Sequence, residues 1–306
     1  MSRETTTRLL REQIVNLWGE GRTELVAANY APDVIDHMPV PGQPAGLQGM
    51  ADVVRGFRAG LPDLRMTLHG TIANGDFGCD FWTLEATNDG PLFGRAATGR
   101  PVAISGIDMV RVQNGRVAEL WHVEEMLQLD AQLGQEPQAF GAPSETYAAA
   151  ATGPYDPGAN AWTPDPATLT ERERRNLGIA REHIEEIWAN GCEGVARKLY
   201  VPDVVDRNPA PGQRPGVDGI LDVLGWLREA APDLRMAIDA YVVEGDLAAD
   251  RWTMTGTHTG GPLLGLPSRG RRFRIHGMDI IHIRDDGLID WVFHVEEFAQ
   301  LRAQIA

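Results

Sequence analysis

The amino-acid sequence contains one pattern of motifs twice, in the same order. The offset between matching residues is 170 at first, from Tyr30 to Tyr200, and reaches 172 at the end, from His122 to His294. The matching segments are Tyr30-Ala-Pro-Asp33 and Tyr200-Val-Pro-Asp203, Pro62-Asp-Leu-Arg-Met66 and Pro232-Asp-Leu-Arg-Met236, Gly106-Ile-Asp108 and Gly277-Met-Asp279, and His122-Val-Glu-Glu125 and His294-Val-Glu-Glu297. An ordered repeat of this length predicts two copies of one domain.

The segment between the copies has the composition of a linker. Residues 135–169 are rich in Gly, Pro, Ala and Thr and show no hydrophobic periodicity. Chains of this kind do not bury a continuous apolar face. We therefore expect a first domain over residues 1–134, a linker over 135–169 and a second domain over 170–306.

Each copy predicts helices followed by strands. Thr170-Glu-Arg-Glu173 has the spacing of a capping box and predicts a helix that runs to about Asn190. A further helix is expected at about Met50 to Arg58. The strands expected in the first copy are Met66–Ile72, Cys79–Thr87, Val102–Val112 and Arg116–Glu124. This order predicts the α+β class, with a curved antiparallel sheet wrapped around N-terminal helices and a cone-like interior.

Composition excludes several functions. With 43 acidic against 28 basic side chains, the net charge of −15 disfavours binding to a nucleic acid. No stretch approaches the roughly 20 apolar residues of a membrane span. The start has no apolar signal segment and there are two cysteines, so we expect a cytoplasmic protein. A single lysine and the lack of a Gly-x-Ser-x-Gly motif disfavour Schiff-base and serine-nucleophile chemistry.

The last predicted hairpin of each copy pairs an acid with a histidine. If Gln113-Asn-Gly115 is a three-residue loop, Asp108 lies opposite Leu120, with His122 as its diagonal neighbour on the same face. A two-residue Asn-Gly turn would instead send His122 to the other face.

The second copy has a longer loop at this hairpin. Arg284-Asp-Asp-Gly287 would set Asp279 opposite Val292, again with His294 diagonal and on the same face. The pair of imidazole and carboxyl group is thus expected to face inward in both copies.

Alternation sends an apolar set of side chains to the other face of these strands. The set consists of Trp121, Val123, Trp291, Phe293 and Val295. Exposure of so much apolar surface to water would be unfavourable. We expect the sheet of one copy to cover that of the other, which gives an intrachain pseudo-dimer. Further homo-oligomers are left open.

Several motifs together resemble a known family. The run from Gly256-Thr-His258 to Arg271, the early Tyr-x-Pro-Asp-Val followed by Pro-Gly-Gln, and the final His-Val-Glu-Glu resemble SnoaL-like polyketide cyclases. These share the fold of nuclear transport factor 2. The resemblance implies cone-shaped domains that pair through their sheets and a reaction without metal or cofactor. It also places His122 and His294 where the family usually has a catalytic carboxylate.

Other candidates each have two interpretations. His258, at a recurring family histidine, and its counterpart Asn88 are predicted to hydrogen-bond a substrate oxygen or to cap a turn. His37 is predicted at the cavity mouth or as a surface residue. Trp82 and Trp252 are predicted to contact ligand or to fill the core.

A metal site is not expected. His122 and Glu124 share a strand face, as His294 and Glu296 do, and could hold a divalent ion together with Asp108 or Asp279. No further histidine is evident in the same cavity.

These observations favour a cofactor-independent cyclase or isomerase that acts on a small apolar or polycyclic carbonyl compound. His122 or His294 would remove a proton next to a carbonyl, and Asp108 or Asp279 would orient the imidazole. The enolate, stabilised by His258, Asn88 or a tryptophan N–H, would close a ring in an aldol-type step or be reprotonated. If only one copy is active, the second is favoured, because it keeps more of the family motif.

The main alternative is a non-catalytic small-molecule-binding module of the same fold. A hydrolytic function has weaker support, because no clear Asp-Arg-Asp triad is present, although Arg111 lies close to Asp108 in sequence.

Overall fold

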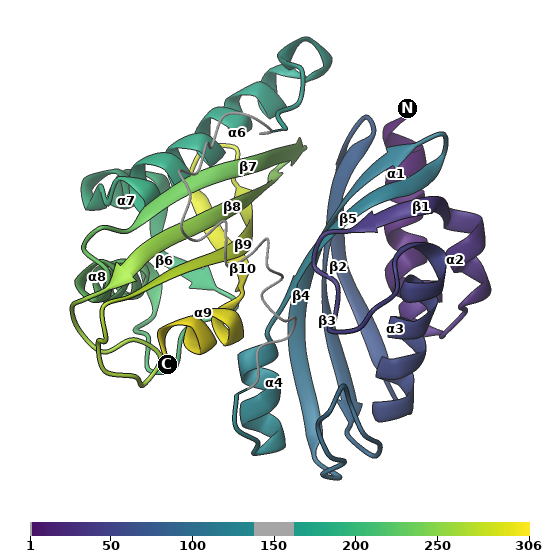
Figure 1. Cartoon of the computed structure of the whole chain (residues 1–306). Coiled ribbons are helices and arrows are strands. Elements are labelled where there is room, and N and C mark those ends of the chain that lie inside the picture. Colours follow the sequence, from purple (N-terminus) through teal and green to yellow (C-terminus); the bar gives the residue numbers. More distant parts are fainter. Residues whose placement is uncertain (1, 138–161) are drawn as a thin grey trace. The chain divides into compact units, whose positions relative to one another are not determined.

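The computed structural model describes residues 2–137 and 162–306 and divides into two compact units (Figure 1). The first unit spans residues 1–142 and the second spans 143–306. Each unit is an α+β domain, as the sequence predicts, and its sheet is mixed and five-stranded.

The first unit begins with helices and continues with strands. Its helices are α1 (Arg3–Arg11), the π-type continuation η1 (Glu12–Gly19), α2 (Glu24–Asn29), α3 (Gly46–Gly60) and α4 (Met126–Leu133). Its strands are β1 (Tyr30–Asp36), β2 (Arg65–Asn74), β3 (Phe77–Thr87), β4 (Pro101–Gln113) and β5 (Arg116–Glu124). The four predicted strands are thus confirmed, with longer bounds at several ends.

Strand β1 was not predicted, and it changes the sheet from antiparallel to mixed. The strand order is β1-β5-β4-β3-β2, and β1 runs parallel to β5 at the edge. Pro32 lies within β1 and makes its sequence unlike that of a regular strand, because proline has no N–H to donate to the hydrogen bonds between strands. The pairing is correspondingly irregular between Tyr30 and Ile35.

The second unit repeats this architecture. Its helical elements are η2 (Pro166–Thr168), α6 (Glu171–Arg181), η3 (Glu182–Ala189), α7 (Glu193–Leu199), α8 (Gly216–Ala230) and α9 (Phe298–Ile305). Its strands are β6 (Tyr200–Asp206), β7 (Arg235–Glu244), β8 (Leu247–His258), β9 (Arg271–Ile283) and β10 (Ile289–Glu296), in the order β6-β10-β9-β8-β7. The predicted capping box of Thr170 and Glu173 is present in both directions.

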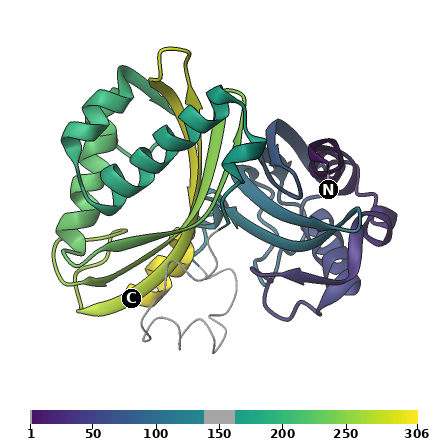
Figure 2. The same ribbon diagram turned by 90° about the horizontal axis from the view of Figure 1, so that it is seen from above.

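In each unit the helices that precede the sheet lie along one of its faces (Figures 1 and 2). In the first unit, Leu10 and Leu17 of the first helices, Val54 of α3, and Val110 and Leu120 of the sheet belong to one buried cluster. The apolar side chains of the first helices are therefore buried against the sheet. Burial of this surface is the main contribution to the stability of the unit.

The register of the last hairpin differs from the prediction. Gln113 pairs with Arg116, so the loop has two residues, and both have positive φ angles, 51° at Asn114 and 77° at Gly115. The expected three-residue loop is therefore wrong. Such two-residue turns fit the twist of paired strands.

A β-bulge keeps His122 on the inner face in spite of the shorter turn. Val112 pairs with Val117 but Arg111 pairs with Glu119, so Ala118 is an extra residue in β5. An extra residue reverses the alternation of the side chains that follow it. Asp108 and His122 consequently lie directly opposite each other, rather than diagonally as predicted.

The second unit reaches the same arrangement through its longer loop. Ile283 pairs with Ile289 and His282 with Trp291, which leaves Asp290 as the extra residue. Asp279 lies directly opposite His294. The predicted sharing of one face by acid and imidazole is therefore confirmed in both copies, by a register that the prediction did not contain.

The glycine of each Gly-x-Asp motif makes room for a tryptophan. Gly106 lies opposite Trp82 on the neighbouring strand, and a Cβ atom on Gly106 would lie 2.2 Å from the indole Cζ2. Gly277 and Trp252 have the same relation, at 2.1 Å. Because Gly106 and Gly277 have no side chain, the indole ring of the opposing tryptophan has room beside them.

The end of the predicted linker is part of the second unit. The N–H of Trp162 donates to Asp239 O at 2.9 Å, and the N–H of Tyr241 donates to Trp162 O at 3.0 Å. Most of the linker, residues 138–161, lies outside the described residues. The expected packing of one sheet against the other stays a prediction.

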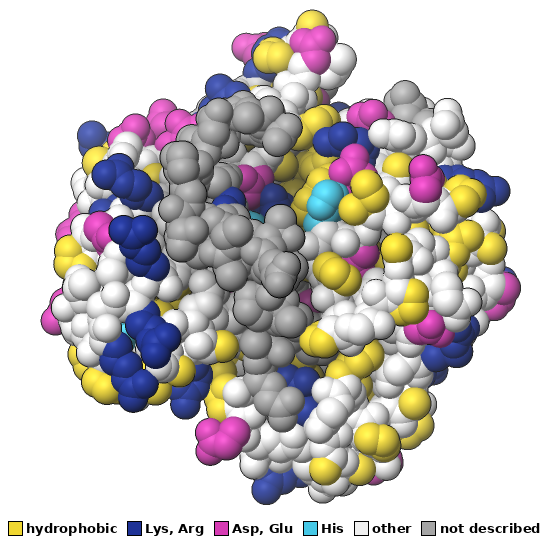
Figure 3. Space-filling model, in the orientation of Figure 1, with side chains coloured by type: hydrophobic (Ala, Val, Ile, Leu, Met, Phe, Trp, Pro, Cys, Tyr) yellow, Lys and Arg dark blue, Asp and Glu magenta, His cyan; other side chains and the backbone are white. Residues whose placement is uncertain are grey.

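The distribution of charged side chains and the length of the helices bear on nucleic acids and membranes as possible partners. On the face drawn in Figure 3, basic side chains lie in several separate groups with acidic side chains between them. Among the residues that the structure describes, no helix is long and apolar enough to cross a membrane.

Replacing Gly277 with alanine should destabilise the second unit. The new methyl group would displace the buried indole of Trp252, and overpacking of this kind costs about 1–3 kcal/mol. The matched control is Gly225→Ala in α8, where no atom lies within 4 Å of the new Cβ. Urea unfolding followed by tryptophan fluorescence should show a loss for Gly277→Ala and no loss for the control. Equal stability of the two variants would contradict the packing argument.

Candidate active site

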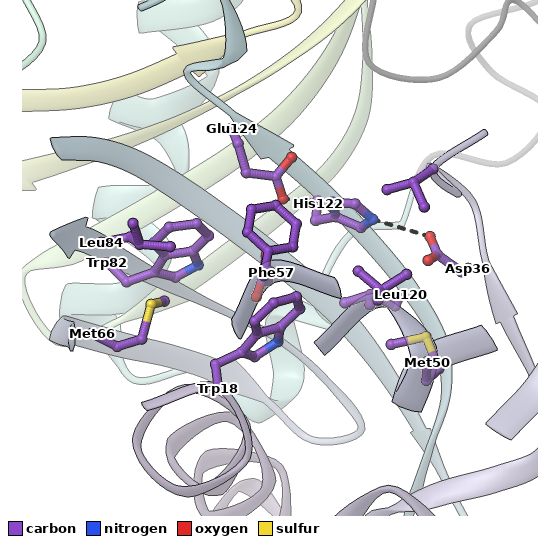
Figure 4. Close-up of a pocket in the computed structure, with 13 residues that line it drawn as sticks. Trp18, Asp36, Met50, Phe57, Met66, Trp82, Leu84, Leu120, His122 and Glu124 are labelled. Atoms are coloured by element: carbon purple, nitrogen blue, oxygen red, sulfur yellow. Dashed lines mark hydrogen bonds and ion pairs between the residues drawn. The ribbon is translucent and has the colours of Figure 1, made fainter. Parts of the chain in front are cut away.

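A pocket in the first unit opens between η1, α3 and the inner face of the sheet (Figure 4). Most of its lining is apolar or aromatic, and one wall carries an imidazole and three carboxyl groups. The lining residues are Trp18, Asp36, Val40, Met50, Val53, Phe57, Met66, Trp82, Leu84, Asp108, Leu120, His122 and Glu124. An apolar pocket with a few convergent polar groups is the usual form of a small-molecule site.

The imidazole of His122 is held between two carboxylates. Its Nδ1 lies 2.6 Å from Oε1 of Glu124, and its Nε2 lies 3.1 Å from Oδ1 of Asp36, the contact drawn as a dashed line in Figure 4. Glu124 reaches the ring because it is two residues further along the same face of β5. Asp36, at the end of β1, is itself fixed by the amide Nε2 of Gln43 at 2.8 Å and the N–H of Met38 at 2.9 Å.

These contacts favour the cationic form of His122. Burial disfavours the charged ring, but the negative charges of Glu124 and Asp36 and their hydrogen bonds raise the pKa of His122 well above its usual range. Burial likewise opposes ionisation of Asp36, yet the charge and hydrogen bond of His122 lower the pKa of that carboxyl group. In that form both ring nitrogens are N–H donors.

This arrangement differs from the expected role of Asp108. The sequence-based hypothesis was that Asp108 orients the imidazole, whereas the structure gives this role to Asp36 and Glu124. Asp108 instead accepts a hydrogen bond from the amide Nε2 of Gln13 at 2.6 Å. The hydroxyl of Tyr30 donates to the other end of that amide, at 2.5 Å, which fixes its orientation.

Asp108 is a buried carboxyl group that ionises near neutral pH. Burial raises its pKa to about 7, the charge of His122 and the hydrogen bond from Gln13 lower it, and the charge of Glu124 raises it. A carboxyl group with this proton affinity can accept and return a proton under physiological conditions.

The second unit carries the same cluster. Nδ1 of His294 lies 2.6 Å from Oε1 of Glu296, and Nε2 lies 3.0 Å from Oδ1 of Asp206. The pKa of Asp279 is raised to about 7, again mainly by burial.

One neighbour of the acid differs between the units. Gln13 is replaced by His183, whose pKa burial lowers to about 3, so this imidazole is neutral. Its Nε2 accepts the indole N–H of Trp188 at 3.1 Å. Asp279 accepts a hydrogen bond from the indole of Trp252 at 3.2 Å instead. The two sites therefore share the imidazole, its two carboxylate partners and the buried acid, and they differ at Gln13 and His183.

Asn88 and His258 have the contacts of turn-forming residues. Oδ1 of Asn88 accepts the N–H of Thr98 at 2.9 Å, and its Nδ2 donates to Gly90 O at 2.8 Å. Nε2 of His258 lies 2.8 Å from Gly261 O. These bonds correspond to the capping interpretation, and a role of either residue in substrate binding stays a prediction.

The remaining candidates divide between the pocket and the sheet surface. Trp82 lines the pocket, and its counterpart Trp252 contacts the acid of the second unit. His37 is outside the pocket lining, where it stacks on Trp121 with ring centroids 4.4 Å apart and contacts Glu119 at 3.0 Å. No group of three side chains suited to a metal ion occurs among residues 2–137 and 162–306.

Sequence reasoning missed three residues that define the site. Asp36 recurs in the second copy as Asp206, and that repetition was the available signal for it. Trp18 also recurs, as Trp188, and the repetition alone does not distinguish a pocket residue from a core residue. Gln13 is not repeated, and no pattern in the sequence indicates its contact with Asp108.

The charge state of His122 can be measured by NMR. We expect its ring to remain doubly protonated at pH 8 in the unmodified protein, because two carboxylates stabilise the cation. Asp36→Asn removes one of them and should lower the pKa of His122 by at least about one unit. His294, whose partners are unchanged, is the internal control. A His122 ring that titrates near pH 6.5 in the unmodified protein would contradict the assignment.

The chain is similar to solved structures that cover one repeat. One is TsrD from Streptomyces laurentii, with 25% identity over 44% of this chain and 99% of that one and a TM-score of 0.41. Another is a candidate polyketide cyclase from Bacillus cereus, with 22% identity over 48% and 89% and a TM-score of 0.41. A third is a SnoaL-like polyketide cyclase from Agrobacterium tumefaciens, with 17% identity over 42% and 98% and a TM-score of 0.36.

No curated protein matches the chain. Two regions, residues 8–133 and 178–305, match the family model of SnoaL-like polyketide cyclases. Together they span most of the sequence and coincide with the two repeats. The chain therefore belongs to the SnoaL-like polyketide cyclase family and contains two tandem copies of its domain.

Proposed function

We propose that the protein is a cofactor-independent cyclase that removes a proton next to a carbonyl group and closes a ring by an intramolecular aldol-type step. Family membership supports the reaction class. The observation that carries the proposal is the buried Asp108 carboxyl group, with a pKa of about 7, in an apolar pocket beside a fixed imidazolium.

Asp108 is the proposed base. The ionised carboxylate takes the proton from the carbon next to the carbonyl, and the electrons of that C–H bond move to give an enolate. The enolate carbon then bonds to a second carbonyl carbon of the same molecule. The new alkoxide takes the proton back from Asp108, so the carboxylate is regenerated and no net proton is consumed.

His122 supports this base by its charge. An imidazolium with both N–H groups directed at carboxylates cannot accept the substrate proton. Its positive charge lowers the pKa of Asp108, which burial alone would raise further. Asp108 is thus the base and His122 is the group that supports it, which is the reverse of the roles expected from the sequence.

Trp18 is the proposed donor to the enolate oxygen. It lines the pocket, and its indole ring is among the side chains drawn there in Figure 4. Donors directed at a developing negative charge in an apolar site contribute strongly to catalysis. The equivalent indole of Trp188 is occupied by His183, which favours the first unit as the active one.

The rest of the lining fits a small apolar or polycyclic carbonyl compound. Met50, Phe57, Met66 and Leu84 supply apolar surface against which a folded or fused-ring ligand can pack. Such a surface holds the reacting carbons close together and excludes water from the enolate.

Proton abstraction can be tested without knowledge of the natural substrate. The full chain is incubated in D2O with a panel of fused-ring ketones such as 1-tetralone and 2-tetralone, and deuterium at the carbon next to the carbonyl is followed by NMR. We expect catalysed exchange whose rate falls about tenfold per pH unit below pH 7, as Asp108 becomes protonated. Asp108→Asn should reduce the rate by about 10²–10⁴-fold.

The matched control is Asp52→Asn, the same change at an exposed residue of α3 outside the pocket. It should leave the exchange rate unchanged. Ligands that quench tryptophan fluorescence but undergo no exchange would contradict the enzymatic proposal and favour the non-catalytic binding module. Loss of exchange in Asp279→Asn but not in Asp108→Asn would assign the reaction to the second unit.

His122→Gln should change the pH dependence of exchange rather than abolish it. Loss of the positive charge raises the pKa of Asp108, so the rate at pH 7 should fall by at least about tenfold and recover toward pH 9. The pH profile of deuterium exchange is the measurement. An equal loss at every pH would contradict the electrostatic role and indicate that the imidazole itself transfers the proton.

A further inference from the structure

Each unit contains a second buried carboxyl group that the proposed mechanism does not use. Asp80 and Asp250 are fully buried, with no exposed surface. Both oxygens of each side chain lack a hydrogen-bond partner among the described residues. A buried carboxylate without donors carries a large energetic cost, so these groups are expected to hold a proton.

The position of Asp80 connects it to the proposed base. Asp80 on β3 lies directly opposite Asp108 on β4, and Asp250 lies directly opposite Asp279. The Cβ atoms of directly opposed residues are about 4.5–5.5 Å apart, which lets two short acidic side chains meet on the same face. Asp108 in turn lies opposite His122, so the three groups form one row across the sheet.

Other neighbours of Asp80 do not supply a compensating charge. Thr71, its partner on β2, is neutral. Burial raises the pKa of Tyr30 well above its usual value, so its hydroxyl is also neutral. Gln13, on the helix packed over this row, carries no charge and is bound to Asp108 and Tyr30. Asp108 is thus the ionised group that acts on Asp80, and burial and the Asp108 charge both raise the pKa of Asp80.

We propose that Asp80 is the protonated member of a carboxyl pair and that a turn of its side chain brings its hydroxyl to the ionised Asp108 carboxylate, which makes Asp80 a positioning residue for the base. This inference rests on the proposed function of Asp108. Two acidic groups this close share at most one negative charge and titrate as a pair. The recurrence of the pair at the same place in both repeats supports a common role.

The pair accounts for how a deeply buried acid stays available as a base. When Asp108 is ionised, the proton of Asp80 stabilises it through a hydrogen bond. When Asp108 has taken the substrate proton, both acids are neutral and the apolar surroundings favour them. Asp80 keeps its own proton throughout, so the pair alternates between one negative charge and none.

The test combines two substitutions with direct observation of the carboxyl groups. The full chain is labelled with ¹³Cγ-aspartate, and the carboxyl signals are titrated by NMR in the unmodified protein, Asp80→Asn and Asp80→Leu. The signal lost in Asp80→Asn identifies Asp80. We expect that signal to have the chemical shift of a protonated acid at pH 8, while Asp108 titrates near pH 7.

The two substitutions should differ in their effect on Asp108. Asparagine keeps an N–H donor, so the pKa of Asp108 should stay within about half a unit, whereas leucine removes the donor and should raise it by at least about one unit. The pH profile of ketone exchange should move by the same amount in Asp80→Leu, with the rate recovered at high pH. Packing alone would lower the rate without moving the profile.

Two results would overturn the proposal. The first is an Asp80 signal that titrates near pH 4 in the unmodified protein, a measurement that stands even if Asp80→Leu does not fold. The second is an unchanged pKa of Asp108 in Asp80→Leu. Because the titrations need no substrate, absence of ketone exchange would refute the proposed reaction while leaving the carboxyl pair separately testable.

Discussion

The interior of each unit depends on one extra residue in its last hairpin. Ala118 in the first unit and Asp290 in the second reverse the alternation of β5 and β10, so that His122 and His294 face the helices. Without the bulge, the tight Asn114-Gly115 turn would direct Trp121 inward and His122 outward. The contacts among imidazole, Asp36 and Glu124 all follow from this reversal.

Once the imidazole faces inward, the charges around it determine the chemistry. Two carboxylates fix His122 as a cation, and this cation limits the rise in the pKa of Asp108 that burial causes. The acid therefore ionises near neutrality although it is almost completely buried. The same balance occurs at Asp279 and His294, which indicates that it is a property of the domain and not of one copy.

The sequence predicts the domain repeat, the order of elements and the shared face of Asp108 and His122. These follow from long-range repetition and from alternation, which are visible in the chain itself. The bulge at Ala118 was not predictable, because one added residue leaves the hydrophobic pattern of a short strand nearly unchanged. Strand β1 was missed because Pro32 interrupts it. The partners of His122 were missed because Asp36 reaches it only through the parallel pairing of β1 with β5.

The proposed chemistry requires that the cluster of the first unit holds its positive charge on His122 and its ionised, proton-accepting group on Asp108. Neutron crystallography of deuterium-exchanged protein at pH 8 would locate the exchangeable hydrogens directly. We expect deuterium on both Nδ1 and Nε2 of His122 and none on the carboxyl oxygens of Asp108. A singly protonated His122 ring beside a protonated Asp108 would contradict the proposed chemistry.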